Sequence, residues 1–183
     1  MRPGDDPSPG LVAVEDHHPQ TAAVEDHHPQ AAATRLGPTH SGQAAETAGG
    51  SASRHPIRSE EHLLTARHAV RAATLDVGFT LVDQTRVVTA ASELVRNAYI
   101  HGGGGTLTIE VVRRADVRGL RLTVTDHGPG ISDLDAAFTD GYTTGPGLGH
   151  GLGGARRLMD DFRIHTAEGH GTTVVATRWT TPP

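Results

Sequence analysis

The stretch TLTIEVVRRADVRGLRLTVTDHGPG, residues 106–130, decides the fold. Its first part alternates polar and apolar residues, and GLRLTVTD repeats the alternation before the glycines, so both segments predict half-buried strands. RRADVR, residues 113–118, has the right length for a hairpin connection. Asp126 falls on the same parity as Leu120 and Leu122, which predicts a carboxylate on the buried side of the sheet. A buried acid needs a partner, and the alternatives are a ligand donor or the backbone of a tight turn.

Helical patterns lie on both sides of this hairpin. Ser59 followed by EEHLLTARHAVRAATL predicts a capped amphipathic helix. Asp83 is the expected N-cap of a second helix, QTRVVTAASELVRNAYIH, which stops at glycines 102–105. GGARRLMDD predicts a third helix, and FRIHTA and TTVVATRW predict two further strands. This order predicts an α/β (α+β) two-layer sandwich, in which a mixed, largely antiparallel sheet carries helices on one face.

Residues 1–54 differ in composition from the rest of the chain. They contain no aromatic residue and almost no large aliphatic one, which predicts a disordered tail before a domain at 55–183. The octapeptide AVEDHHPQ occurs twice in this tail, at 13–20 and at 23–30, and two copies are too few for a solenoid. Its histidine pairs either ligate a metal or belong to a solvated linker, since no spacing fixes a coordination geometry. These histidines are His17, His18, His27 and His28.

The overall composition excludes several classes of protein. The formal net charge is -5, so a basic surface for nucleic acid is not expected. All 16 basic residues are arginine, which excludes a Walker A lysine, the strand lysine of eukaryotic-type protein kinases and a Schiff-base lysine. Cysteine is absent, which excludes thiol catalysis and thiolate zinc sites. Without a long apolar run or a charged-then-apolar leader, we expect a cytoplasmic protein with no membrane partner.

Two motifs place acids and amides where chemistry can use them. Glu93 and Asn97 lie four residues apart, so they share one side of the expected second helix. Such a pair can orient a hydroxyl group and hold a hard cation, although the same pair is commonplace on an exposed helix face. Asp126 begins DHGPG, in which Gly128 and Gly130 let a ligand approach the backbone.

Two further motifs are rich in glycine. GPGLGHGLGG, residues 145–154, runs into the third helix and exposes backbone N–H groups that can cradle a phosphate without lysine. It is not the dinucleotide fingerprint, because no βαβ unit surrounds it. Residues 131–146 form a long irregular segment, which is typical of a lid or binding loop. GHGT, residues 169–172, is a hairpin turn that places the Thr172 hydroxyl inward.

Taken in this order, the four motifs resemble the N box, G1 box, G2 box and terminal Gly-Thr pair of the GHKL ATPase/kinase superfamily, which has the Bergerat nucleotide-binding fold. The matching positions are Glu93 and Asn97, then Asp126, Gly128 and Gly130, then Gly147, Gly149 and Gly151, and finally Gly171 and Thr172. Over roughly residues 56–180 the chain is most similar to the RsbT-type switch serine/threonine kinases of the bacterial stressosome. The tail has no counterpart in this resemblance.

The resemblance implies a site for ATP and Mg²⁺. Asp126 would accept a hydrogen bond from the adenine amino group, and Thr172 would support the adenine edge. Asn97 would hold Mg²⁺ against the phosphates, and Glu93 would be the general base for a substrate hydroxyl. The remaining nucleotide-binding residues would be Gly128, Gly130, Gly147, Gly149, Gly151 and Leu152. Arg156 and Arg157 either neutralise phosphate charge or are solvated, and His101, His127 and His150 would lie at the rim.

The implied activity is that of an ATP-dependent protein serine/threonine kinase in anti-sigma regulation. Its substrate would be a serine on a STAS-domain antagonist in a partner-switching stress response, and a PP2C-type phosphatase or a sigma factor would be a further partner. The alternative is a non-catalytic, nucleotide-gated binding module that sequesters a sigma factor or an antagonist. Glu93 favours the kinase, because a module that only binds ATP has no need of a general base.

Overall fold

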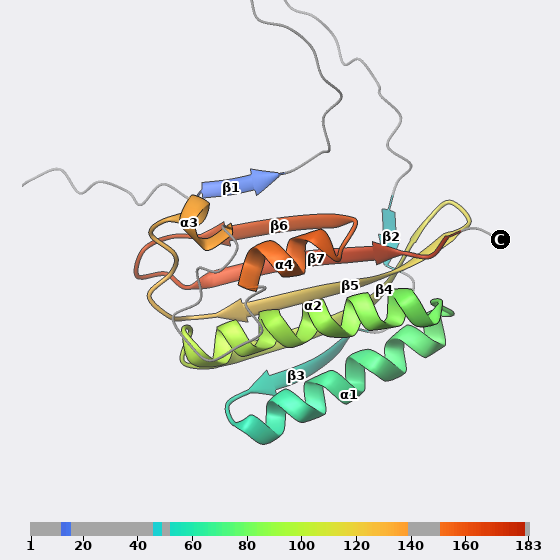
Figure 1. The fold of residues 1–183 in the computed structure, drawn as a ribbon, viewed down its shortest axis with the longest axis horizontal. Coiled ribbons are helices and arrows are strands. Elements are labelled where there is room, and N and C mark those ends of the chain that lie inside the picture. The colour runs from blue at the N-terminus through green and yellow to red at the C-terminus, as the bar shows by residue number, and fades with distance from the viewer. Residues whose placement is uncertain (1–11, 16–45, 49–51, 139–150, 182–183) are drawn as a thin grey trace, which may run out of the picture.

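The computed structural model describes residues 12–15, 46–48, 52–138 and 151–181, which form a sheet with helices against one face (Figure 1). The strands are β1 (Val12–Glu15), β2 (Glu46–Ala48), β3 (Ser53–Ile57), β4 (Gly105–Arg114), β5 (Val117–Asp126), β6 (Asp161–Thr166) and β7 (Thr172–Trp179). The helices are α1 (Glu60–Val77), α2 (Leu81–Ile100), α3 (Leu134–Phe138) and α4 (Gly151–Arg157). The predicted two-layer α/β architecture is confirmed.

The sheet has the strand order β1-β6-β7-β5-β4-β2, and β3 also pairs with β4. Every pairing among the described residues is antiparallel, so the sheet is not mixed in this part of the chain. Helix α2 packs between α1 and α4 and contacts the central strands. No helix in the described part of the chain is long and apolar enough to cross a membrane.

Two strands lie within the tail that was expected to be disordered throughout. Strand β1 pairs with β6 and β2 pairs with β4, so each lies at one edge of the sheet. A short strand can join an open edge through its backbone alone, which is why a segment without large side chains still pairs there. Strand β3 begins at Ser53, two residues before the expected start of the domain at 55. The paired histidines His17, His18, His27 and His28 lie outside the described residues.

The two long helices begin at polar caps. Ser59 caps α1 as predicted, and its side chain accepts a hydrogen bond from the His62 N–H. The prediction of Asp83 as the cap of α2 is wrong, because Thr80 occupies that position. Thr80 Oγ1 accepts from the Asp83 N–H at 3.2 Å and donates to Asp83 Oδ2 at 2.8 Å. Thr80 and Asp83 hold the first and last positions of a capping box, but the Asp83 carboxylate accepts from the Thr80 hydroxyl and not from its backbone N–H.

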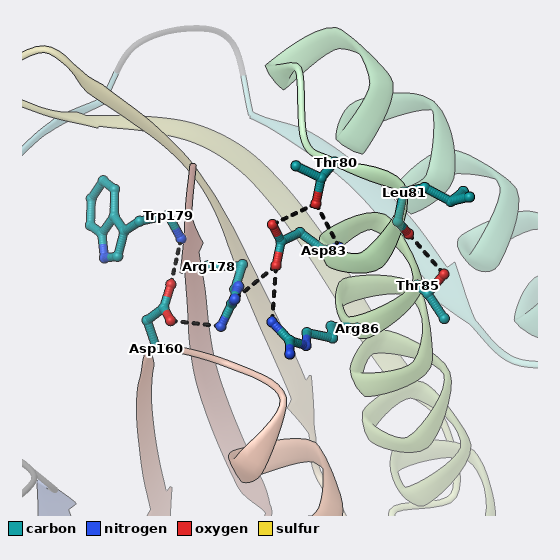
Figure 2. Close-up of polar contacts among 8 residues, drawn as sticks. All are labelled: Thr80, Leu81, Asp83, Thr85, Arg86, Asp160, Arg178 and Trp179. Carbon is teal, nitrogen blue, oxygen red and sulfur yellow. Dashed lines mark hydrogen bonds and ion pairs between the residues drawn. The ribbon is translucent and has the colours of Figure 1, made fainter. Parts of the chain in front are cut away.

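Asp83 also links the beginning of α2 to the end of β7 through an ion pair with Arg178 (Figure 2). Its Oδ1 accepts from Arg178 Nη2 at 2.7 Å and from Arg86 Nη1 at 3.3 Å. Arg178 Nη1 donates to Asp160 Oδ1 at 2.7 Å, and Asp160 Oδ2 accepts from the Trp179 N–H at 2.8 Å. Burial alone would raise the pKa of Asp83, but the Thr80 and Arg178 hydrogen bonds and the Arg178 charge outweigh it, so the pKa lies below its ordinary value.

The predicted hairpin is present and places Asp126 at one end of the sheet. β4 and β5 pair from Gly105 with Asp126 to Arg114 with Val117. The connection is a two-residue turn, tighter than expected, and Ala115 has a positive φ of 49°. The fully buried Leu107, Leu120 and Leu122 of this hairpin and Val87 and Leu94 of α2 belong to the core. Helix α4 (Gly151–Arg157) corresponds to the predicted helix GGARRLMDD, but it both begins and ends earlier in the chain than that segment.

Candidate active site

A cavity of about 500 Å³ lies between the C-terminal half of α2 and the ends of β5 and β7. This volume is within the usual range of small-molecule sites. Apolar side chains form much of its wall, and the polar groups come from separate elements that converge on it. The lining residues used below are Leu94, Asn97, Ala98, His101, Gly102, Asp126, Gly130, Ile131, Ser132, Asp133, Gly151, Leu152 and Thr172.

Asp126 is the acidic group held most firmly at this cavity. It is the last residue of β5, and it is in register with Gly105 of β4 and Thr172 of β7. Its Oδ1 accepts two backbone hydrogen bonds, from Gly128 N–H at 3.0 Å and from Thr172 N–H at 3.2 Å. Among the described residues Oδ2 has no hydrogen-bond partner, so this oxygen is available to a donor in the cavity.

The position of the Asp126 side chain depends on close contact between glycines. A Cβ atom at Gly102 would collide with the Asp126 side chain, and one at Gly128 would collide with the backbone of Gly102. The turn after α2 and the turn after β5 can therefore touch only because both positions lack a side chain. Gly128 shapes the site in this way and through its N–H group, although it is not a lining residue.

Thr172 is held by a buried threonine of the neighbouring strand. Thr166 Oγ1 donates to the Gly171 carbonyl at 3.0 Å and accepts from the Ile131 N–H at 2.9 Å. It lies 3.1 Å from Thr172 Oγ1. Because the single proton of Thr166 goes to Gly171, the proton between the two hydroxyl groups comes from Thr172. Thr172 therefore presents acceptor lone pairs to the cavity.

Asn97 and Glu93 occupy different positions relative to the cavity. Asn97 lines it, and so do Leu94, Ala98 and His101 on adjacent turns of α2. Glu93 is half-buried one turn earlier, about 6 Å along the helix axis, and is not a lining residue. By helical geometry it falls at the margin of the face that carries Asn97.

The structure thus brings most of the predicted site residues to one cavity. Asn97, Asp126, Gly130, Gly151, Leu152 and Thr172 line it. Gly147, Gly149 and His150 lie outside the described residues, as do residues 139–146 of the predicted binding loop, whereas its first half contains α3. His101 lines the cavity, whereas His127 is exposed beside it. Arg156 lies over the Phe138 ring at 5.2 Å, and neither it nor Arg157 lines the cavity in the described part of the chain.

Several lining residues were not predicted as site residues, among them Leu94, Ala98 and Gly102, whereas Ile131, Ser132 and Asp133 belong to the predicted binding loop 131–146. Leu94 and Ala98 belong both to the buried core and to the cavity wall, so the apolar stripe of α2 continues from the core into the cavity. Ile131, Ser132 and Asp133 precede α3, where Asp133 Oδ1 caps the Ala136 N–H at 2.8 Å. A capping aspartate before a short apolar run was the one signal in the sequence that could have located α3.

The donor set at the cavity fits a magnesium ion that is bound chiefly by phosphates. Mg²⁺ usually keeps several waters and takes only one or two protein oxygens beside the substrate phosphates. The Asn97 side chain supplies such an oxygen on the cavity wall. No group of three or more histidine, aspartate or glutamate side chains in the described residues can hold a metal without such a substrate.

Comparison with known proteins agrees with this geometry. A family model described as a histidine kinase-like ATPase domain matches residues 58–178. The serine/threonine-protein kinase RsbT of Bacillus subtilis (strain 168) is 42% identical over 123 residues, which cover 67% of this chain and 92% of RsbT. An anti-sigma F factor of Clostridium novyi (strain NT) is 34% identical over 115 residues, which cover 60% of this chain and 80% of that protein.

A solved structure supports the fold. The crystal structure of the RsbU and RsbW domains of Rv1364c from Mycobacterium tuberculosis aligns with a TM-score of 0.52 and 22% identity, covering 73% of this chain and 34% of that one. At this identity the likeness concerns the fold alone. The predicted superfamily, and a protein serine/threonine kinase as the enzyme class, are confirmed by the family match and by the similarity to RsbT.

Proposed function

The chain belongs to the histidine kinase-like ATPase domain family, and we propose that it transfers the γ-phosphoryl group of ATP to a serine hydroxyl of a partner protein. The observation that carries this proposal is the hydrogen bonding of the Asp126 carboxylate. One carboxylate oxygen is held by two backbone N–H groups, and the other is open to the cavity. An acceptor fixed in this way matches the amino group of adenine, and the acceptor lone pairs of Thr172 support the same edge.

The phosphates would lie towards Asn97 and Gly151. Both residues line the cavity, and Gly147 and Gly149 would contribute backbone N–H groups from the adjoining segment. A bound Mg²⁺ would neutralise phosphate charge and would be held by the Asn97 side-chain oxygen. Since the chain has no lysine, backbone amides, this ion and arginine must together stabilise the transferring group.

Glu93 is the proposed general base. The serine oxygen attacks the γ-phosphorus, the bond from that phosphorus to the bridging oxygen breaks, and ADP leaves with the bond electrons. The serine proton passes to the Glu93 carboxylate. Because Glu93 lies at the margin of the cavity-lining face of α2, it meets a protein substrate at the rim and leaves the nucleotide contacts to Asn97 and Asp126.

The class of partner follows from similarity to named regulators. RsbT and the anti-sigma F factor both resemble this chain over most of their own length. We therefore propose a serine on a STAS-domain antagonist as the substrate, a partner-switching stress response as the pathway, and a PP2C-type phosphatase or a sigma factor as the further partner. The cytoplasm is the compartment in which ATP and these partners would be met. The boundary between tail and domain near residue 54 remains a prediction.

Replacement Glu93→Gln tests the kinase against a nucleotide-gated binding module. Loss of a general base typically lowers the rate about 10²–10⁴-fold, whereas the ATP contacts of Asn97 and Asp126 remain. We expect phosphoryl transfer to a purified STAS-domain partner to fall by that factor, with almost unchanged affinity for a fluorescent ATP analogue. Asn97→Ala should weaken both, since Asn97 lines the cavity itself.

The matched control is Glu61→Gln, which removes an exposed acid on α1 and should leave both quantities unchanged. If the wild-type protein binds a STAS-domain partner in an ATP-dependent way but transfers no labelled phosphate to it, the kinase proposal fails. The non-catalytic module then becomes the function that accounts for the site.

A further inference from the structure

A row of three polar residues crosses the sheet beside the cavity, one from each of β6, β7 and β5, which lie side by side in Figure 1. Thr166 is in register with Thr172, and Thr172 is in register with Asp126. Thr172 and Asp126 line the cavity, whereas Thr166 is 4% exposed and is not among the described residues that line it. Thr166 can therefore affect a ligand only through its neighbours.

The contacts of Thr166 determine where the hydroxyl protons of this row lie. Thr166 Oγ1 accepts from the Ile131 N–H at 2.9 Å and donates at 3.0 Å to the Gly171 carbonyl, which can only accept. The contact with Thr172 Oγ1 at 3.1 Å then needs the Thr172 proton. The opposite assignment would set Thr166 Oγ1 and the Gly171 carbonyl against each other as two acceptors in a buried position.

The turn before β7 holds the Gly171 carbonyl in place. Gly171 has a φ of 81°, which favours glycine, and a Cβ atom at this position would collide with the Asp126 carbonyl. The turn thus packs directly against the end of β5. The acceptor for the Thr166 proton is therefore part of a tightly packed backbone.

Two acceptors consequently face the cavity from adjacent strands, Asp126 Oδ2 and Thr172 Oγ1. Residues directly opposite each other on antiparallel strands have Cβ atoms about 4.5–5.5 Å apart. An NH₂ group that donates both hydrogens at about 2.9 Å, in directions about 120° apart, needs acceptors about 5 Å apart. The spacing of the two strands therefore suits one exocyclic amino group that donates to both residues.

We propose that Thr166 is a positioning residue that makes this cavity select a 6-aminopurine over a 6-oxopurine. The inference rests on the proposed function, in which adenine binds at Asp126. Asp126 alone does not exclude a 6-oxopurine, because its carboxylate can accept from the ring N–H of that base. Thr166 takes up the Thr172 proton, so Thr172 accepts from an amino group but has no proton to donate to an oxo group.

ATP and inosine triphosphate (ITP) test this inference, because ITP has an oxo group in place of the amino group and a ring N–H in place of the adjacent ring nitrogen. The measurement is the ratio of the Kd for ITP to the Kd for ATP. Both constants are obtained by displacement of a fluorescent ATP analogue from the full-length protein. Thr166→Val removes the hydroxyl and leaves the Thr172 proton free for the oxo group, so we expect the ratio to fall at least about tenfold.

Two control variants separate selectivity from packing. Thr166→Ser keeps the hydroxyl and should keep the ratio within about twofold of the wild type. Thr173→Val removes the 3.2 Å hydrogen bond from Thr173 Oγ1 to Thr125 Oγ1, which joins β7 to β5 on the opposite face of the sheet, and should leave the ratio unchanged. A loss of packing alone weakens the binding of both nucleotides by the same factor, so it does not alter the ratio.

Thr172→Val keeps the inference testable if Thr166→Val does not fold. It removes the acceptor that faces the amino group, so the ratio should fall at least about threefold. Addition of Thr166→Val to this variant should cause no further fall, because Thr166 then has no hydroxyl group to act through.

The inference is overturned if the wild type binds ATP and ITP equally, or if either Thr166→Val or Thr172→Val keeps the wild-type ratio. A further fall in the double variant would also overturn it, since Thr166 would then act by another route. These results leave the proposed function standing where ATP affinity still depends on Asp126. A wild-type protein that binds no ATP would overturn the proposed function and this inference together.

Discussion

Replacement of Asp126 by asparagine is expected to weaken ATP binding and to leave the fold intact. In the wild-type protein Oδ1 accepts from the Gly128 and Thr172 N–H groups at 3.0 and 3.2 Å. The asparagine oxygen takes this place, because the reverse orientation would set an NH₂ donor against two N–H donors. The NH₂ group then replaces Oδ2 at the cavity. The adenine amino group consequently meets a donor where it had met an acceptor.

The magnitude follows from this exchange of groups. A hydrogen bond to a charged group contributes about 1.5–3 kcal/mol, and a donor left against a donor adds a desolvation cost, so we expect a loss of about 2–4 kcal/mol. At about 1.4 kcal/mol for each tenfold change, the Kd for ATP should rise about 30- to 700-fold. The melting temperature should change little, because both backbone hydrogen bonds to this side chain remain.

Titration with a fluorescent ATP analogue measures the effect. Asp133→Asn is the matched control, since it removes an equal charge from the same cavity while its amide oxygen still caps the Ala136 N–H. Its effect on affinity should stay below about 0.5 kcal/mol. Equal ATP affinities for the wild type and Asp126→Asn, at equal melting temperatures, would refute the assignment of Asp126 to the adenine amino group.

Two further predictions concern residues that support the fold around the site, Asp83 and Gly102. Asp83→Asn should lower the free energy of unfolding by about 1–2 kcal/mol at neutral pH, because it weakens a buried pair with Arg178. The pKa of Asp83 is lowered on folding, so its carboxylate stabilises the protein above the unfolded pKa and loses this effect as the pH falls through the folded pKa. The difference in unfolding free energy between wild type and variant, measured with urea, should therefore narrow below about pH 4. A difference that stays constant with pH would contradict this. Gly102→Ala should displace the Asp126 side chain and weaken ATP binding, whereas Gly103→Ala, where a methyl group meets no neighbour within 4 Å, should lower only the stability. Equal ATP affinities of these two glycine variants would show that contact with Gly102 does not position Asp126.

Periodicity predicted the hairpin, both long helices and the last two strands, because these elements bury one face of a regular pattern. It did not predict β3, because Pro56 and the lack of alternation in SRHPI are typical of a loop. A proline is tolerated in β3 because this strand lies at the outer side of β4. It also misplaced the beginning of α2. Leu81 and Val82 are 75% and 60% exposed, so the first turn of the helix carries apolar residues on its solvent side and breaks the amphipathic pattern.

The candidate site was predictable wherever a motif carries its own chemistry. Asp126 ends a strand of fixed parity, so its side chain could be assigned to the inner surface from the sequence alone. Asn97 shares one side of α2 with Glu93, but that pair also suits an exposed helix face, so the sequence assigned it to the site only through the family resemblance. The wall formed by Leu94 and Ala98 could not be separated from the core in this way. Core and cavity share one face of α2, and only the packing of neighbouring elements determines where the core ends.

Thr166 shows most clearly what local sequence does not reveal. It is a buried threonine at the end of β6 without a motif around it, and its partner Ile131 lies 35 residues earlier in the chain. Its single proton goes to the Gly171 carbonyl, which turns the Thr172 hydroxyl into an acceptor towards the cavity. Thr166 is also the β6 residue that pairs with Val12 of β1. Thr166 thus contacts the Thr172 hydroxyl at the cavity and also lies on the strand that β1 joins.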